Sequence, residues 1–182
     1  MDKHQFRKKC IDTLKQIPLD VRKQQSLTLI EKLLLWKNLT QFNSILGYVA
    51  LPSEPNLQGF YEQCSRLGLA LGFPKTQEDG KMNYWSQGER SVKLDPTALN
   101  PTLILVPALA FGPEGERLGR GGGYFDRFLL KYRRVLGKGA FFALGVTFSQ
   151  TLFSAIPQDP WDQKVDAVVS EMGFGLYPTR NE

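Results

Sequence analysis

Residues 102–111, TLILVPALAF, form a continuous apolar run with turn-forming residues on both sides. A strand with apolar side chains on both faces is typical of a parallel sheet, in which both faces are covered. Parallel strands are joined by crossover connections, and these are usually helices. The run therefore favours an α/β architecture, with helices on the faces of a central sheet.

The rest of the chain alternates between helical and extended patterns. Helices are expected over 3–17, over 21–37, over the residues from the cap Asn56 to 67, and over 123–136. Strands are expected over 44–51, 69–74, 82–86, 140–148 and 165–171. A turn is expected at 77–81 and a polar loop over 88–101. This alternation predicts a three-layer α/β fold with a mostly parallel central sheet and the N-terminal helices packed on it. The whole chain, 1–182, is expected to form a single domain.

Composition limits the possible partners. The chain has 182 residues, of which 42% are hydrophobic, and its net charge is +5. A positive charge favours anionic partners, and nucleic acid, phosphorylated metabolites and carboxylate-rich substrates all fit it. No apolar run approaches the roughly 20 residues of a membrane span. The first residues also lack the apolar core of a signal peptide, so we expect a cytoplasmic protein.

Histidine and cysteine are scarce. His4 is the only histidine, which excludes multi-histidine metal sites and, unless His4 itself serves, histidine-dependent nucleophilic catalysis. Cys10 and Cys64 form neither a disulfide framework nor a thiolate metal site. Any metal is therefore expected to be a hard cation with oxygen ligands.

A glycine-rich loop, RLGRGGGYFDRFL at 117–129, follows the apolar run and enters a predicted helix. Its glycines let the backbone approach a bulky anion, and the free N–H groups of a helix N-terminus favour phosphate. The loop leaves the carboxyl end of a strand, where open α/β sheets bind ligands. Arg117 and Arg120 can add charge-assisted hydrogen bonds. Asp126, one turn into the helix, suggests a magnesium ion between its carboxylate and a phosphate.

Two common phosphate-binding patterns do not fit this loop. The Walker pattern ends in Gly-Lys-Ser/Thr, which is absent here. The dinucleotide fingerprint needs a small residue where this loop has Tyr124. The alternative interpretation is a glycine-rich turn with solvated arginines, in which Asp126 is only a charge in the first helical turn.

The longer stretch LILVPALAFGPEGERLGRGGGYFDRFL resembles the signature of the 5-formyltetrahydrofolate cyclo-ligase family over about 25 consecutive positions. That signature runs from valine-proline through a short apolar stretch and a loop to Gly-x-Arg-Leu-Gly-x-Gly-x-Gly-Tyr-aromatic-Asp. Weaker likeness covers most of the chain. Lys3 and Arg7 fit the N-terminal pattern of the family, Glu54 fits the glutamate after its first strand, and DQKVDAVVSE fits its closing segment.

The resemblance implies an ATP-dependent cyclisation of 5-formyltetrahydrofolate to 5,10-methenyltetrahydrofolate, with release of ADP and phosphate. The γ-phosphoryl group would be transferred to the formyl oxygen, and the folate N10 would then attack the formyl carbon as phosphate departs. The partners would be these two small molecules, with Mg²⁺ as the cofactor. Neither a membrane nor a nucleic acid is expected as a partner.

The resemblance also implies roles for individual residues. Arg120 and Tyr124 would be catalytic, and Asp126 and Asp162 would hold Mg²⁺. The residues that would bind ATP are Lys3, Arg7, Arg117, Leu118, Gly119, Arg120, Gly121, Gly122, Gly123, Tyr124 and Phe125. The residues that would bind the folate are Val49, Glu54, Arg120, Gly121, Gly122, Gly123 and Tyr124.

Several of these residues have simpler interpretations. Lys3 and Arg7 fit a solvated basic helix face, Asp162 a turn, Glu54 an exposed turn carboxylate, and Val49 the interior of a strand.

The half of the sequence assigned to the folate departs from the family pattern. An Ile-Pro-Glu/Gln-Pro segment usual before the central strand is replaced by SVKLDPTALNP. Pro55 follows Glu54 where a β-branched or apolar residue is usual, and Phe125 replaces a second tyrosine. Trp85 fits either a stacking partner for the pterin or a core residue.

Other functions stay open at this point. The altered folate half is compatible with a non-catalytic relative that binds folate or nucleotide. The charge and the Arg-Gly stretch suggest RNA binding, but the basic residues are scattered and the aromatic residues are expected in the core, where an RNA-binding sheet would expose a stacking pair. The glycine pattern disfavours a Rossmann dehydrogenase.

Overall fold

Strand β5 (Thr102–Pro107) comes from the apolar run and lies inside the sheet. Leu103 and Leu105 pack into the core on one face of the sheet, and Ile104 and Val106 into the core on the other. Each of these four side chains is at most 1% exposed. The expectation of a strand that is covered on both faces is therefore confirmed.

The computed structural model describes residues 2–77, 81–87, 91–99, 101–137 and 141–176. Within them, the main sheet has the strand order β10-β9-β8-β5-β1-β2-β3-β4. The other strands of this sheet are β1 (Ser44–Leu46), β2 (Ala70–Thr76), β3 (Met82–Ser86), β4 (Lys93–Leu94), β8 (Phe141–Val146), β9 (Ala167–Ser170) and β10 (Gly173–Leu176). The strands from β9 to β2 are parallel, and antiparallel pairs lie at both edges. The expected mostly parallel centre is confirmed.

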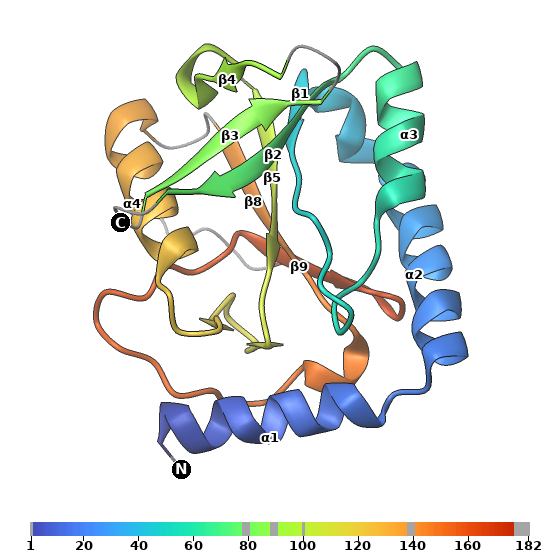
Figure 1. Ribbon diagram of the computed structural model, residues 1–182, viewed down its shortest axis with the longest axis vertical. Helices are drawn as coiled ribbons and strands as arrows, with labels where there is room; N and C mark the ends of the chain where they lie inside the picture. Colours follow the sequence, from blue (N-terminus) through green and yellow to red (C-terminus); the bar gives the residue numbers. More distant parts are fainter. Residues whose placement is uncertain (1, 78–80, 88–90, 100, 138–140, 177–182) are drawn as a thin grey trace.

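Helices cover the two faces of this sheet, as the three-layer prediction requires (Figure 1). Helices α2 (Leu19–Leu34) and α3 (Gln58–Arg66) pack on one face. Helix α4 (Tyr124–Leu136) packs on the other face through Phe128, Leu129 and Tyr132. Short 3-10 helices, η1 (Lys37–Gln41), η2 (Pro96–Ala98) and η3 (Ser149–Thr151), complete the described helical elements.

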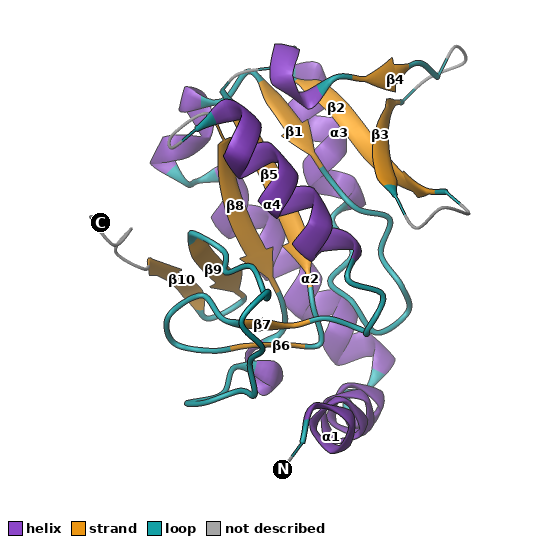
Figure 2. Cartoon of the chain, turned by 90° about the vertical axis from the view of Figure 1, so that its left-hand side faces the viewer, coloured by secondary structure: helices purple, strands orange, loops and turns teal. Residues whose placement is uncertain are grey.

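Helix α1 (Lys3–Gln16) does not lie on a face of the sheet, so the expectation for the N-terminal helices is correct for α2 alone. It crosses the end of the sheet, beside the small hairpin of β6 (Ala110–Phe111) and β7 (Arg117–Leu118) (Figure 2). The reason is that Phe6, Cys10 and Leu14 share a third core cluster with residues of the hairpin and with Phe148. This placement brings the start of α1 to the carboxyl ends of the parallel strands.

Two expected strands end, or leave the main sheet, several residues early. The run 102–111 leaves the main sheet after Pro107 and continues as β6, which pairs with β7. The strand expected over 44–51 ends at Leu46, because the Tyr61 hydroxyl both accepts from the Tyr48 backbone N–H and donates to the Tyr48 carbonyl. These bonds occupy the backbone groups that a longer β1 would offer to a neighbouring strand.

Three described strands were not expected from the sequence. Strand β7 lies at the start of the glycine-rich stretch 117–129, which was expected to begin as a loop. Strand β4 is too short to show an alternating pattern and lies in the expected loop 88–101, and β10 follows the last predicted strand after a tight turn. The centre of the expected turn at 77–81 and parts of that loop, 78–80, 88–90 and 100, lie outside the described residues.

Cys10 and Cys64 are both buried and neither forms a disulfide, in agreement with the sequence. Burial raises the pKa of the Cys10 thiol to about 11 and that of Cys64 to about 12. Among the described residues, no helix combines the length and the apolar character that crossing a membrane would need.

Candidate active site

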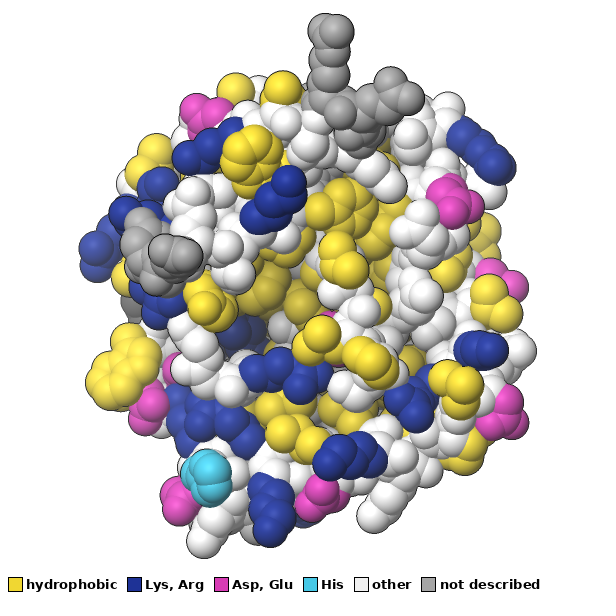
Figure 3. Space-filling model, viewed as in Figure 1, with side chains coloured by type: hydrophobic (Ala, Val, Ile, Leu, Met, Phe, Trp, Pro, Cys, Tyr) yellow, Lys and Arg dark blue, Asp and Glu magenta, His cyan; other side chains and the backbone are white. Residues whose placement is uncertain are grey.

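A cavity of about 960 Å³ opens at the carboxyl ends of β1 and β5. Tyr48 and Val49, just after β1, line one side of it, and Pro107 and Ala108, at the end of β5, line another. From β1 the sheet grows toward β2 on one side and toward β5 on the other, and open α/β sheets bind ligands at such a switch point. Figure 3 shows the hollow, with a hydrophobic floor and Lys and Arg side chains gathered along one side.

The glycine loop forms a wall of this cavity and needs its glycines for two different reasons. Gly121 and Gly123 have φ angles of +111° and +63°, which side chains other than glycine rarely adopt. A Cβ atom on Gly122 would lie 2.5 Å from Cε2 of Tyr124. Within the described part of the chain, the backbone N–H groups of residues 120–123 donate no hydrogen bond, so this loop presents free donors at the start of α4.

A buried ion pair anchors this loop to α4. Arg117 is 5% exposed, and its Nη2 donates to Oδ1 of Asp126, which also accepts from the backbone N–H of Gln163 at 2.9 Å. Burial lowers the pKa of the Arg117 guanidinium, and the charge of Asp126 opposes that effect. The Nε of Arg117 is buried and has no hydrogen-bond partner among the described residues, so this cation keeps an unused donor.

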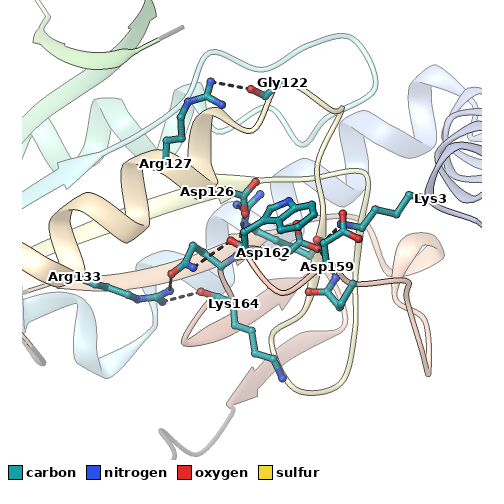
Figure 4. Close-up of polar contacts among 12 residues, drawn as sticks. Lys3, Gly122, Asp126, Arg127, Arg133, Asp159, Asp162 and Lys164 are labelled. Atoms are coloured by element: carbon teal, nitrogen blue, oxygen red, sulfur yellow. Dashed lines mark hydrogen bonds and ion pairs between the residues drawn. The ribbon is translucent and has the colours of Figure 1, made fainter.

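Helix α1 supplies two cations to the same wall. Lys3 Nζ donates to Asp159 at 2.7 Å and also donates to Asp162 (Figure 4). These contacts join residues near opposite ends of the chain. Burial alone would lower the pKa of Lys3, but the hydrogen bonds and charges of these two carboxylates raise it above its ordinary value. Arg7 Nε donates to the Gly119 carbonyl at 3.0 Å, so α1 and the glycine loop are in direct contact.

The loop after β1 contacts the glycine loop through another ion pair. Arg120 Nε lies 3.2 Å from Glu54 Oε1, and Arg120 Nη2 donates to the Ser53 hydroxyl at 2.9 Å. The second carboxylate oxygen of Glu54 accepts from the Leu51 backbone N–H at 3.0 Å. The Glu54 side chain is only 8% exposed, so its interpretation as an exposed turn carboxylate is wrong.

All the residues that the resemblance assigns to the two substrates and to Mg²⁺ line this one cavity. Val49 is 73% exposed, so the alternative that it lies in the interior of a strand is wrong. Trp85 does not line the cavity; it lies with Lys75, whose Nζ is 4.8 Å from its ring centroid. The individual roles of the lining residues stay predictions.

Sequence reasoning gave no role to several lining residues, among them Tyr48, Met82, Asp159 and Trp161. Asp159 and Trp161 come just before Asp162 in the sequence, so their closeness to a predicted metal ligand was a signal that could have identified them. Met82 gave no such signal, because its strand reaches the cavity only through its pairing with β2.

The chain is similar to known proteins over most of its length. The pattern that defines the 5-formyltetrahydrofolate cyclo-ligase family matches residues 1–171. A Schizosaccharomyces pombe protein named probable 5-formyltetrahydrofolate cyclo-ligase is 33% identical over 107 residues, covering 54% of this chain and 52% of that protein, so the match spans about half of the relative's length. The 5-formyltetrahydrofolate cyclo-ligase of Mus musculus is 23% identical over 182 residues, covering 87% of this chain and 88% of that protein.

A solved structure has the same fold. The 5,10-methenyltetrahydrofolate synthetase from Mycoplasma pneumoniae superimposes with a TM-score of 0.81 at 21% sequence identity, covering 94% of this chain and 99% of that chain.

Proposed function

Since the chain belongs to the 5-formyltetrahydrofolate cyclo-ligase family, we propose that it converts 5-formyltetrahydrofolate and ATP into 5,10-methenyltetrahydrofolate, ADP and phosphate. The observation that supports this most is the composition of the cavity. Segments far apart in the sequence, at 3–7, 48–54, 117–126 and 159–162, meet around one space with cations, free backbone donors and an apolar floor. A location in the cytoplasm stays the expectation of the sequence.

The chemistry divides into two steps. The formyl oxygen is a poor leaving group, so it first takes the γ-phosphoryl group of ATP, and ADP is released. The folate N10 then forms a bond to the formyl carbon and loses its proton, while the carbon–oxygen bond breaks and phosphate leaves with that proton. Because the two substrates supply every reacting atom, the protein has to position them and to stabilise phosphate charge.

The residues of the cavity suit that task. Arg120 and the free N–H groups of residues 120–123 can donate to phosphate oxygens, and so can the unused Nε of Arg117. Glu54 can accept hydrogen bonds from the N–H groups of the pterin beside the exposed Val49. Arg120 contacts Glu54 directly, so it lies between the two proposed substrates, where the phosphoryl group is transferred.

The carboxylates of Asp126 and Asp162 fit a magnesium site. Each uses one oxygen for a cationic side chain and a backbone N–H, and the other oxygen, Oδ2 of Asp126 and Oδ1 of Asp162, has no hydrogen bond within the described residues. Those residues hold no group of three or more acidic, histidine or cysteine side chains that could bind a metal. Mg²⁺ usually takes one or two carboxylates together with substrate phosphates, and when bound it would neutralise phosphate charge.

The proposal is tested by incubating the protein with 5-formyltetrahydrofolate, ATP and Mg²⁺ and following the absorbance of the methenyl product. Omission of each component in turn is the control, and product should form only when all three are present. Binding of folate or ATP without any product would favour the non-catalytic alternative. A salt-dependent RNA gel shift at physiological ionic strength, without product, would favour RNA binding.

The change Glu54→Gln is expected to weaken folate binding about tenfold or more, because a hydrogen bond to a charged group contributes about 1.5–3 kcal/mol. Glutamine keeps a carbonyl acceptor for the Leu51 N–H but loses the charge that faces the pterin and Arg120. Titration calorimetry with 5-formyltetrahydrofolate measures the effect. Glu62→Gln, on the exposed side of α3, is the matched control. Equal folate affinities of wild type and Glu54→Gln would remove Glu54 from the proposed site.

The change Gly123→Ala is expected to lower the free energy of unfolding by about 1–2 kcal/mol, because residue 123 is held in a left-handed conformation. Gly68→Ala is the matched control: its φ is +81° and no atom lies within 4 Å of its added Cβ. Urea unfolding should show a loss for both variants, with the larger loss for Gly123→Ala, whose added Cβ would lie 2.8 Å from Arg127 Nη1. Only Gly123→Ala should also lower kcat, since only Gly123 lies in the proposed phosphate loop. Equal kcat values in the two variants would contradict that role.

A further inference from the structure

Trp161 is a large aromatic side chain that lines the cavity but is not covered by the protein. It is 66% exposed, whereas tryptophan normally buries a large apolar area in folded proteins. The chain's other described aromatic residues at the cavity, Tyr48, Tyr124 and Phe125, are all less exposed. An exposed indole at the rim of a ligand-sized cavity offers a flat surface that is available for stacking.

The turn that carries Trp161 is held on both sides. The Asp159 backbone N–H donates to Asp162 Oδ2 at 2.7 Å, and the Asp162 backbone N–H donates to the Asp159 carbonyl at 3.1 Å. Lys3 binds both carboxylates, and Gln163 is tied to Asp126 of α4 through its backbone N–H. Because the backbone on both sides of the indole is ordered in this way, stacking on it costs little additional ordering.

The position of this turn indicates which of the two proposed substrates the indole would contact. The turn lies beside α1 and the start of α4, next to Lys3 and the two carboxylates proposed for Mg²⁺ (Figure 4). The part of the cavity lined by β2 and β3, with Pro74, Thr76 and Met82, lies away from it (Figures 1 and 2). The proposed folate occupies the part of the cavity with Glu54 and the apolar residues, so the turn that carries Trp161 borders the part left for the nucleotide.

We propose that Trp161 is the surface on which the purine base of ATP stacks, with the phosphates directed from there along Lys3 toward the glycine loop. The inference rests on the proposed function, because it assigns the base of the nucleotide that this function uses. Stacking of a base on an aromatic side chain typically changes affinity about tenfold when the ring is removed. Inorganic tripolyphosphate carries the three phosphates of ATP without the nucleoside. A change in affinity for ATP that is not seen for tripolyphosphate therefore isolates the contribution of stacking.

The test compares the dissociation constants of ATP and inorganic tripolyphosphate, both with Mg²⁺, by titration calorimetry. Trp161→Ala should raise the Kd of ATP about tenfold and leave the Kd of tripolyphosphate unchanged. Trp161→Phe keeps an aromatic ring and should remain within about threefold of wild type for both ligands. Trp85→Phe, away from the cavity, is the matched control and should change neither constant. Urea unfolding shows that each variant is folded.

Other outcomes overturn the inference. An equal rise in Kd for ATP and tripolyphosphate on Trp161→Ala would mean that the ring only supports the turn. An unchanged Kd for ATP in that variant would mean that the ring does not touch the base, and normal methenyl production by wild type would then leave the proposed function intact. Absence of ATP-dependent product in wild type would overturn the proposed function and this inference together.

Discussion

Replacing Arg120 with alanine is expected to lower kcat for methenyl-folate formation about 100-fold or more, because it removes a charged donor aimed at developing phosphate charge. The guanidinium is positioned before the substrates bind, by Glu54 at 3.2 Å and by the Ser53 hydroxyl at 2.9 Å. Its side chain is 40% exposed, so its loss is not expected to unfold the protein. Steady-state kinetics with saturating ATP and 5-formyltetrahydrofolate measures the effect.

Arg134→Ala is the matched control for this change. It removes the same charge from an exposed position of α4 that does not line the cavity, and its kcat should stay near that of wild type. Arg120→Lys should restore part of the rate, because it returns a charge without the planar pair of donors. A folded Arg120→Ala protein with an unchanged kcat would falsify the proposed catalytic role.

The change Asp126→Ala is expected to lower the free energy of unfolding by about 3–5 kcal/mol, because it leaves a buried cation without its carboxylate. Arg117 is 5% exposed, and its described charged partner within salt-bridge distance is Asp126. The backbone N–H of Gln163 would lose its acceptor as well. Urea unfolding at neutral pH measures the difference from wild type.

A double-mutant cycle with Arg117→Met separates the ion pair from other effects of Asp126→Ala. In the Arg117→Met background the buried cation is absent, so the further loss on Asp126→Ala should be much smaller. Equal losses in the two backgrounds would show that Asp126 stabilises the fold without Arg117. The result also decides how Mg²⁺ binding is probed, since an unstable Asp126 variant would lose activity whatever its metal affinity. Asp162→Asn, which keeps an acceptor for Lys3, is then the better variant for a magnesium titration.

Local pattern was sufficient to predict the central elements of the fold. The apolar run predicted a strand covered on both faces, and both faces of β5 pack into the core. The helical pattern from residue 3 predicted α1, which begins at Lys3 after a capping box between Asp2 and Gln5. The ends of elements were less predictable. Strand β1 stops at Leu46 because the Tyr61 hydroxyl, from a later helix, takes the next backbone groups, and no feature of residues 44–51 reports that contact.

The family resemblance supplied the members of the candidate site, but the partners of those members came only from the structure. The sequence suggested that Arg120 contacts phosphate and that Glu54 contacts folate, without indicating that the two side chains form an ion pair. It placed Asp126 beside a metal, without indicating that the same carboxylate neutralises buried Arg117. It gave Trp161 no role, because the exposure of a side chain depends on what packs over it.

The sequence by itself determined the α/β class, the covered central strand and the glycine loop at the start of α4, because short-range patterns of apolar residues and glycines control local conformation. Only the tertiary structure decided that α1 lies across the carboxyl ends of the strands and not on the sheet. That placement depends on the packing of Phe6 and Leu14 into a third apolar cluster at the end of the sheet. The same placement brings Lys3 into contact with Asp159 and Asp162. No local sequence pattern predicts this contact, because it results from packing between segments that are far apart in the sequence.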